Sequence, residues 1–154
     1  MEEKSLLDPC LKTVCLMLLA LALASCALPR LVFLRDPLTP EEHINLGVSY
    51  EKRAELDAAL KEYKAAAKKM PLANLYVGNI YFQQKEYSMA EKSYKKAIKK
   101  VESPDAYNNL AWLYYTTDAN LDEAERLAMK AVELSPTSEA FRDTLQKIRK
   151  KQRE

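Results

Sequence analysis

The sequence predicts an all-α fold built from repeated pairs of helices. The first observation behind this prediction is the spacing of four prolines: Pro40, Pro71, Pro104 and Pro136 lie 31, 33 and 32 residues apart. Proline is tolerated in the first turn of a helix and disfavoured inside it. The prolines therefore mark boundaries between successive helical units.

The second observation is that each interval repeats one order of residue types. A small residue follows an aliphatic one, an aromatic residue comes three positions later, and two alanines flank a ring further on, except that Ala128 replaces this ring in the third unit. The three sets are Leu46-Gly47, Tyr50, Ala59, Tyr63 and Ala66; Val77-Gly78, Tyr81, Ala90, Tyr94 and Ala97; and Leu110-Ala111, Tyr114, Ala124, Ala128 and Ala131. This order resembles the tetratricopeptide repeat. The resemblance implies a short right-handed superhelix of antiparallel helix pairs.

The predicted repeat domain ends in a capping helix. The domain covers residues 40–153, with units at about 40–70, 71–103 and 104–137 and a cap at 138–151. A stack of such units exposes apolar surface at its end, and this surface needs a cover. Ser138 can begin the capping helix, and Phe141, Leu145 and Ile148 fall on one face of it.

The N-terminal segment has the pattern of an export signal. Val14–Ala24 contains eleven uncharged residues, too few for a helix to cross a hydrocarbon core of about 30 Å but typical of a secretory signal. This run leads into Leu23-Ala24-Ser25-Cys26, which resembles the lipobox of bacterial lipoproteins. The resemblance implies a signal peptide at 1–25 and acylation of Cys26, with palmitate among the chains. A plain signal peptide or an uncleaved anchor is the alternative.

Acylation of Cys26 predicts a location on a bacterial envelope membrane, because two or more acyl chains anchor a protein stably. Ala27 follows the cysteine, and in enterobacterial lipoproteins such a residue is typical of the outer membrane, here facing the periplasm. Residues 26–39 form a short tether. Its apolar run Leu31-Val32-Phe33-Leu34 either packs on the first repeat, or inserts at the membrane surface or docks on a partner as a strand.

Composition argues against catalysis and against nucleic acid as a partner. The chain has 24 Lys and Arg against 22 Asp and Glu, a formal net charge of +2, which gives no electrostatic case for binding nucleic acid. Two glycines cannot supply a phosphate-binding loop, and one histidine excludes multi-histidine metal sites. We therefore expect no enzyme activity, catalytic residue, cofactor, metal site or small-molecule substrate.

The resemblance also implies a concave groove, lined by the first helix of each unit, that binds a partner protein or peptide. The positions carried over by alignment with the small residue are Val48, Lys52, Leu75, Asn79, Phe82, Asn108, Trp112 and Tyr115. Asparagine donates and accepts hydrogen bonds as peptide groups do, and aromatic residues supply apolar anchors. The alternative is that the aromatic residues pack against neighbouring helices.

One feature of the family's peptide sites is missing. Chaperone-cofactor repeats hold a terminal carboxylate with lysine and arginine, but the matching positions here are Ile44, Val48, Asp105 and Asn109. Capture of an acidic C-terminal motif is therefore not predicted. The many lysines between residues 61 and 100 fall on the second helices, where they form a solvated face or steer the domain toward anionic headgroups.

These expectations combine into one functional hypothesis. The chain is a non-catalytic scaffold or assembly factor, anchored through Cys26, for a protein complex of the bacterial envelope. The alternative is an accessory or regulatory domain that positions an envelope enzyme, such as a peptidase or a cell-wall hydrolase. Neither hypothesis names the partner, since a fold does not identify a ligand.

Overall fold

The computed structural model describes residues 13, 14, 17 and 36–154, and it divides into the units Met1–Pro37 and Leu38–Glu154. In the first unit, Thr13, Val14 and Met17 are helical. Cys26, the lipobox and the apolar run of the tether lie outside the described residues, so the lipoprotein signal stays a prediction. Within the described part, no helix is long and apolar enough to cross a membrane.

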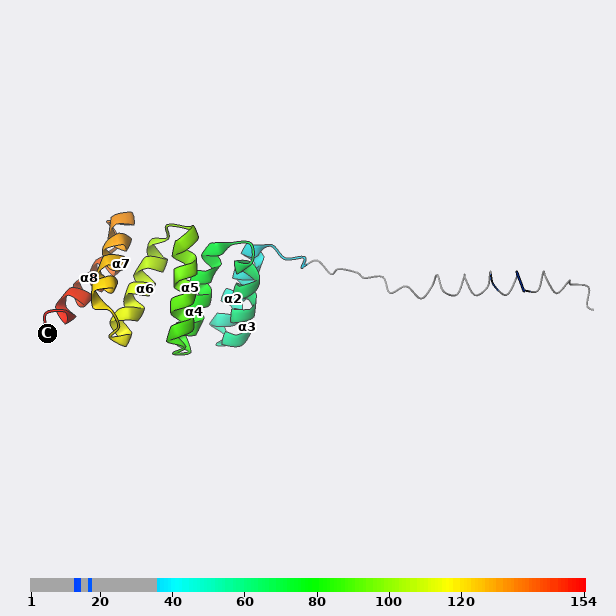
Figure 1. Cartoon of the computed structure of the whole chain (residues 1–154), viewed down its shortest axis with the longest axis horizontal. Helices are drawn as coiled ribbons and strands as arrows, with labels where there is room; N and C mark the ends of the chain where they lie inside the picture. The colour runs from blue at the N-terminus through cyan, green and yellow to red at the C-terminus, as the bar shows by residue number, and fades with distance from the viewer. Residues whose placement is uncertain (1–12, 15–16, 18–35) are drawn as a thin grey trace, which may run out of the picture. The chain divides into compact units, whose positions relative to one another are not determined.

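The second unit is a row of helices joined by short turns (Figure 1). A short 3-10 helix, Pro71–Ala73, precedes α4. The α-helices are α2 (Pro40–Lys52), α3 (Leu56–Ala67), α4 (Asn74–Gln83), α5 (Tyr87–Lys100), α6 (Pro104–Thr117), α7 (Leu121–Leu134) and α8 (Glu139–Lys151). No residue from 36 to 154 lies in a strand. The all-α prediction is confirmed.

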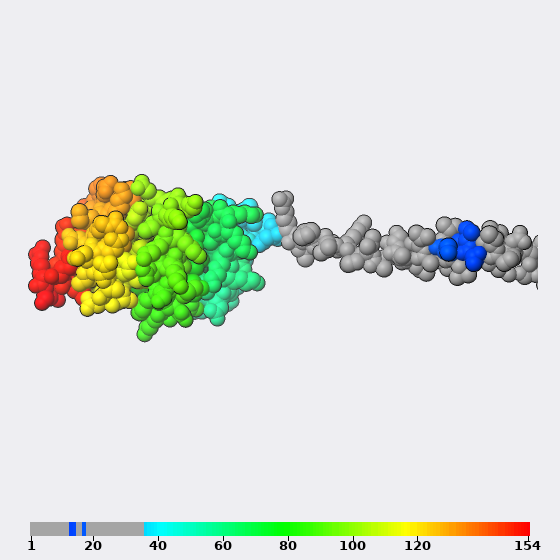
Figure 2. Space-filling model, viewed as in Figure 1, coloured from blue at the N-terminus to red at the C-terminus, as the bar shows by residue number. Residues whose placement is uncertain are grey.

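The helices pack in sequence order. α2 packs on α3, α4 on α5 and α6 on α7, and each pair then contacts the next through α3 with α4, α5 with α6 and α7 with α8. Figure 2 shows the same order on the surface of this unit, where the colours follow one another without mixing. Such nearest-neighbour packing is the arrangement expected of a repeat protein.

Local sequence explains where the helices begin. Thr39 caps α2, since its hydroxyl accepts from the Glu42 backbone N–H at 3.2 Å and its own N–H donates to the Glu42 carboxylate at 2.7 Å. Pro40 and Pro104 occupy the first turns of α2 and α6, while Pro136 lies in the turn before α8. Each of these prolines therefore lies in the first turn of a helix or in the turn before one.

The small residues of the repeat pattern bring paired helices together. A Cβ placed on Gly78 of α4 would overlap the ring of Tyr94 on α5, and one on Gly47 of α2 would overlap the ring of Tyr63 on α3. Tyr63 is fully buried and Tyr94 nearly so. Each glycine therefore leaves the space that a buried tyrosine ring from the partner helix fills.

The helix α8 covers the end of the stack, as predicted. Its buried residues are Phe141, Thr144 and Ile148. Ile148 belongs to the core cluster that includes Leu110 and Leu127, and Leu145 packs against this cluster. The apolar stripe of α8 thus closes the core of the third helix pair, which solvent would otherwise reach.

The single histidine has a structural place. His43 is buried on α2, and its Nδ1 lies 2.7 Å from the Glu62 carboxylate of α3. This contact joins the two helices of the first pair.

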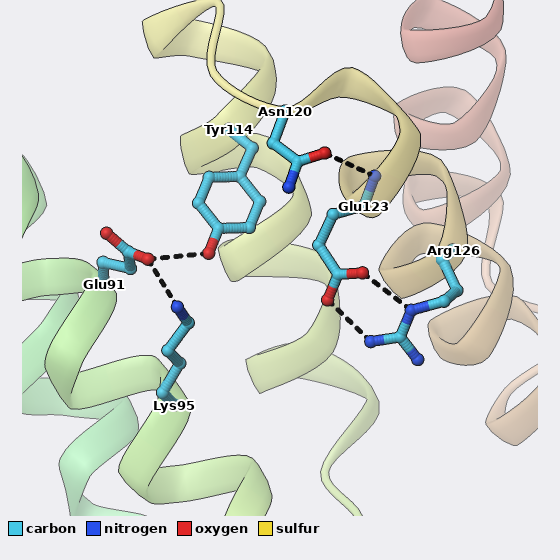
Figure 3. A network of polar contacts seen from close by, with 6 residues as sticks. All are labelled: Glu91, Lys95, Tyr114, Asn120, Glu123 and Arg126. Carbon is cyan, nitrogen blue, oxygen red and sulfur yellow. Dashed lines mark hydrogen bonds and ion pairs between the residues drawn. The ribbon is translucent and has the colours of Figure 1, made fainter.

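A polar network joins the second and third helix pairs (Figure 3). The Tyr114 hydroxyl of α6 donates to the Glu91 carboxylate of α5 at 2.7 Å, and the Lys95 ammonium lies 2.6 Å from the same oxygen. These hydrogen bonds, from Lys95 first and then from Tyr114, hold the pKa of Glu91 below its usual range. The folded state therefore stabilises the ionised form of Glu91 relative to the unfolded chain.

This network predicts a pH-dependent stability contribution. We expect Tyr114→Phe to lower the free energy of unfolding by about 0.5–1 kcal/mol at pH 7, because it removes one bond to a partly exposed carboxylate. Since the folded-state pKa of Glu91 lies below its usual value of 4.5, the contribution is complete above about pH 4.5 and is lost as pH falls below it. Urea unfolding of the wild type and the variant at pH 7 and at pH 3 measures the loss of stability and its dependence on pH.

Tyr115→Phe is the matched control for this experiment, because within the described chain the Tyr115 hydroxyl makes no hydrogen bond and the residue neighbours Tyr114 on α6. It should leave stability unchanged at both values of pH. An equal loss for Tyr114→Phe at pH 7 and pH 3 would contradict the ionic role of Glu91.

Candidate concave binding groove

A pocket of about 240 Å³ lies along the first helices of the pairs. Six of its lining residues come from α2, α4 and α6, and the seventh, Tyr94, comes from α5. The lining residues are Glu51, Asn79, Phe82, Gln83, Tyr94, Asn109 and Trp112. The groove thus draws on all three helix pairs, and its lining combines carboxylate, amide and aromatic groups.

Two asparagines form the polar centre of this groove. The Oδ1 atom of Asn79 accepts from the Tyr94 hydroxyl at 3.0 Å and from Nδ2 of Asn109 at 2.9 Å. In the described chain, Nδ2 of Asn79 and Oδ1 of Asn109 make no hydrogen bond to protein. The pair therefore offers one donor and one acceptor, the same groups that an extended peptide presents.

A carboxylate is fixed at one end of the groove. Glu51 accepts from the Tyr63 hydroxyl at 2.7 Å and from Nε2 of Gln83 at 2.9 Å. Burial, followed by the bond to Glu51, raises the pKa of Tyr63 well above its usual range. Burial likewise raises the pKa of Tyr94. Both phenols stay protonated at neutral pH and act as fixed donors that orient Glu51 and Asn79.

The aromatic end of the groove is supported by α8. Trp112 stacks on Tyr115 with ring centroids 5.0 Å apart. The ammonium of Lys147 lies 5.4 Å from the Trp112 ring and that of Lys151 lies 5.1 Å from the Tyr115 ring. Lys151 also donates to the backbone carbonyl of Tyr115 at 3.1 Å. The capping helix therefore holds the two rings in place in addition to closing the core.

The structure separates the predicted groove residues into two groups. Asn79, Phe82 and Trp112 line the pocket. The remaining five lie elsewhere. Leu75 is buried in the core. Val48 packs against a core cluster that includes Tyr63 and Ile80, and Tyr115 packs against the cluster that includes Leu110 and Leu127. Lys52 is exposed at the end of α2, and Asn108 is half-buried with its Oδ1 atom lacking a hydrogen bond among the described residues.

Sequence reasoning did not include four lining residues, Glu51, Gln83, Tyr94 and Asn109, in the groove. Three of them lie one helical turn from a predicted position: Glu51 from Val48, Gln83 from Asn79 and Asn109 from Trp112. Helical residues three or four apart share a face, so this spacing is the signal that would have found them. Tyr94 belongs to a second helix and had no such signal.

The family models match two of the helix pairs. Residues 77–99 and residues 105–135 each match a model described as a tetratricopeptide repeat. They correspond to α4 with α5 and to α6 with α7. Among curated proteins, none matches the chain in sequence.

Solved tetratricopeptide repeat domains have the same fold. The first repeat domain of Spaghetti (RPAP3), bound to the HSP90 peptide SRMEEVD, is 20% identical with a TM-score of 0.69, covering 75% of this chain and 94% of that one. The Sgt2 domain from Aspergillus fumigatus is 16% identical with a TM-score of 0.67, covering 73% and 78%. A tetratricopeptide repeat protein from Parabacteroides merdae is 21% identical with a TM-score of 0.64, covering 73% and 45%.

Proposed function

We propose that this chain is a non-catalytic scaffold that binds a partner peptide in its concave groove. The observation that carries the proposal is the Asn79–Asn109 pair, which offers an unused amide donor and an unused acceptor beside the rings of Phe82 and Trp112. Amide groups satisfy a peptide backbone, and the rings provide apolar contact area for its side chains. The RPAP3 domain has a similar fold and is bound to a peptide, which supports the proposal.

The charge of the groove favours a neutral or basic peptide. Glu51 is the charged residue of the pocket lining, and both of its carboxylate oxygens are held by hydrogen bonds. At the positions of the basic clamp, Ile44 packs against the core and Asn109 is bonded to Asn79. An acidic peptide end would meet the negative charge of Glu51 in a pocket that no lysine or arginine of the described chain lines, so like-charge repulsion disfavours it.

We propose further that the scaffold serves a complex of the bacterial envelope and is anchored through acylated Cys26 at the outer membrane, facing the periplasm. The support is the lipobox pattern Leu23-Ala24-Ser25-Cys26, together with the absence of any other cysteine after residue 15. A lone exported cysteine has no disulfide partner, and acylation gives it a role.

Affinity capture with mass spectrometry from detergent extracts tests the groove. The test variant is Gln83→Ala, Asn109→Ala, Trp112→Ala, which leaves the bond between Tyr94 and Asn79 intact. The control variant is Ser88→Ala, Lys99→Ala, Met129→Ala, three exposed positions on the second helices. We expect the test variant to capture at least about tenfold less of the partner than the wild type, since truncated interface anchors commonly cost more than 1 kcal/mol of binding free energy each. The control variant should capture as much as the wild type.

The outcomes separate the parts of this proposal. Equal capture by both variants, at matched melting temperatures, would place the partner outside the groove. Capture of a peptidase or cell-wall hydrolase would favour the accessory-domain alternative.

Metabolic palmitate labelling in the same cells tests the anchor. The wild type should be labelled and the Cys26→Ser variant should not; equal labelling of the two would contradict acylation of Cys26.

A further inference from the structure

A second groove lies between the second helices of the first two pairs. It has a volume of about 460 Å³ and runs between α3 and α5, with residues of α4 at its base. Four lysines line it: Lys64 and Lys68 near the end of α3, and Lys92 and Lys96 on α5. It shares no lining residue with the concave pocket, so an inference about it does not depend on the proposed peptide site.

Among the described residues, the four lysines form no ion pair. In the part of the chain that the structure describes, none of them lies within 4.0 Å of an Asp or Glu oxygen. The ammonium of Lys64 lies 5.0 Å from the Tyr81 ring instead. Four like charges gathered around one groove repel one another, and a bound anion relieves this repulsion.

The acidic residues of the same two helices are engaged elsewhere. On α3, Asp57 accepts from Gln84 at 3.2 Å and Glu62 contacts His43 at 2.7 Å. On α5, Glu91 is held by Lys95 at 2.6 Å and by Tyr114. None of these carboxylates forms an ion pair with a lysine of the groove, so the four ammonium groups are available to a ligand.

The groove also presents apolar surface between its lysines. Tyr81 lies at its base, and Met89 of α5 is 38% exposed at its edge. Methionine side chains adapt to the shape of an apolar partner. A ligand that fills this groove must therefore carry both negative charge and an apolar group.

The shape of the groove and the chemistry of its side chains select the class of ligand. The base of a groove cannot touch a flat membrane, so headgroups would reach the lysine tips and leave Tyr81 uncovered. The groove also contains no arginine, the residue that binds phosphate with two parallel hydrogen bonds. A protruding peptide can carry an apolar side chain into the groove. Its carboxylates can pair with lysine ammonium groups and do not need the two parallel hydrogen bonds of arginine.

We propose that the α3–α5 groove binds an acidic, amphipathic segment of a partner protein. Lys64 with Lys68 and Lys92 with Lys96 are each four residues apart, about one helical turn. Glutamates spaced four apart on a helical peptide match each lysine pair, while an apolar side chain of the peptide packs on Met89 and Tyr81.

The test uses the full chain in a non-ionic detergent. The probes are fluorescein-labelled peptides of about 12 residues with two glutamate pairs spaced four apart and leucines beside them, together with the same peptides carrying glutamine for glutamate. The test variant is Lys64→Gln, Lys68→Gln, Lys92→Gln, Lys96→Gln. The control variant, Lys61→Gln, Lys69→Gln, Lys99→Gln, Lys100→Gln, removes the same charge from exposed positions outside the groove.

Fluorescence anisotropy should show binding of the glutamate peptides to the wild type, weakened by salt and absent for the glutamine peptides. The test variant should lose at least about tenfold in affinity and the control less than about threefold, because several ion pairs act together only in the groove. Equal losses in both variants, or no binding of any acidic peptide, would overturn the proposal. A third result would also overturn it: no peptide binds, and anionic phosphatidylglycerol vesicles bind the wild type and the control variant but not the test variant.

Discussion

Replacing Gly78 by alanine is expected to lower the free energy of unfolding by about 1–3 kcal/mol. In most helices this substitution stabilises by about 0.5–1 kcal/mol, because alanine restricts the unfolded chain. Here the new Cβ would stand 2.5 Å from Cδ1 of Tyr94. The ring has no room to retreat, since Tyr94 is 2% exposed and its hydroxyl is bonded to Asn79. Urea unfolding followed by circular dichroism measures the change.

The control for Gly78→Ala is the same substitution in a Tyr94→Leu background. Leucine lacks the ring that meets the added Cβ, so the cost of Gly78→Ala should fall below about 0.5 kcal/mol there. The difference between the two backgrounds is the coupling energy of the pair. Stabilisation by Gly78→Ala in the wild-type background would show that the helices α4 and α5 are not held at this close distance.

Replacing Ile148 by alanine is expected to cost about 2–5 kcal/mol, the larger of the two effects. Ile148 is fully buried and belongs to the core cluster of the second and third helix pairs. Alanine would remove apolar contacts and leave a cavity between α8 and the stack. Because each repeat unit is supported by its neighbours, the helices next to the cavity should open first in the variant. Amide hydrogen exchange should therefore be fastest in α6 to α8.

Lys150→Ala is the control on the same helix. Lys150 is exposed, and its contact is an ion pair of 3.8 Å with Glu154, so the substitution should change stability by less than about 0.5 kcal/mol. A small effect of Ile148→Ala, close to that of Lys150→Ala, would show that α8 does not hold the end of the repeat stack.

Much of the fold was predictable because the signals that define it are local. Proline spacing and capping residues such as Thr39 and Ser138 place helix starts through bonds within three or four residues. The order of small and aromatic residues implied helix pairs through its resemblance to a known repeat, and in the structure Gly47 and Gly78 face tyrosine rings across such pairs. The stripe on residues 138–151 predicted the cap for the same reason, since one helix carries the whole apolar face.

The composition of both grooves was decided by the tertiary structure. Alignment placed Leu75 and Tyr115 in the concave groove, but Leu75 lies in the core and Tyr115 packs against it. Glu51 and Asn109 line the pocket because the stacking of the helix pairs brings residues of α2, α4 and α6 to one place.

The lysine groove has the same origin, since it joins residues of α3 and α5 that lie 28 positions apart in the chain, from Lys64 to Lys92. The sequence by itself determined the helix pairs and their cap, through interactions within a turn or a helix pair. The surfaces that a partner meets were decided only by the packing of successive pairs. Their relative angles result from many side-chain contacts at once, and no single residue type encodes them.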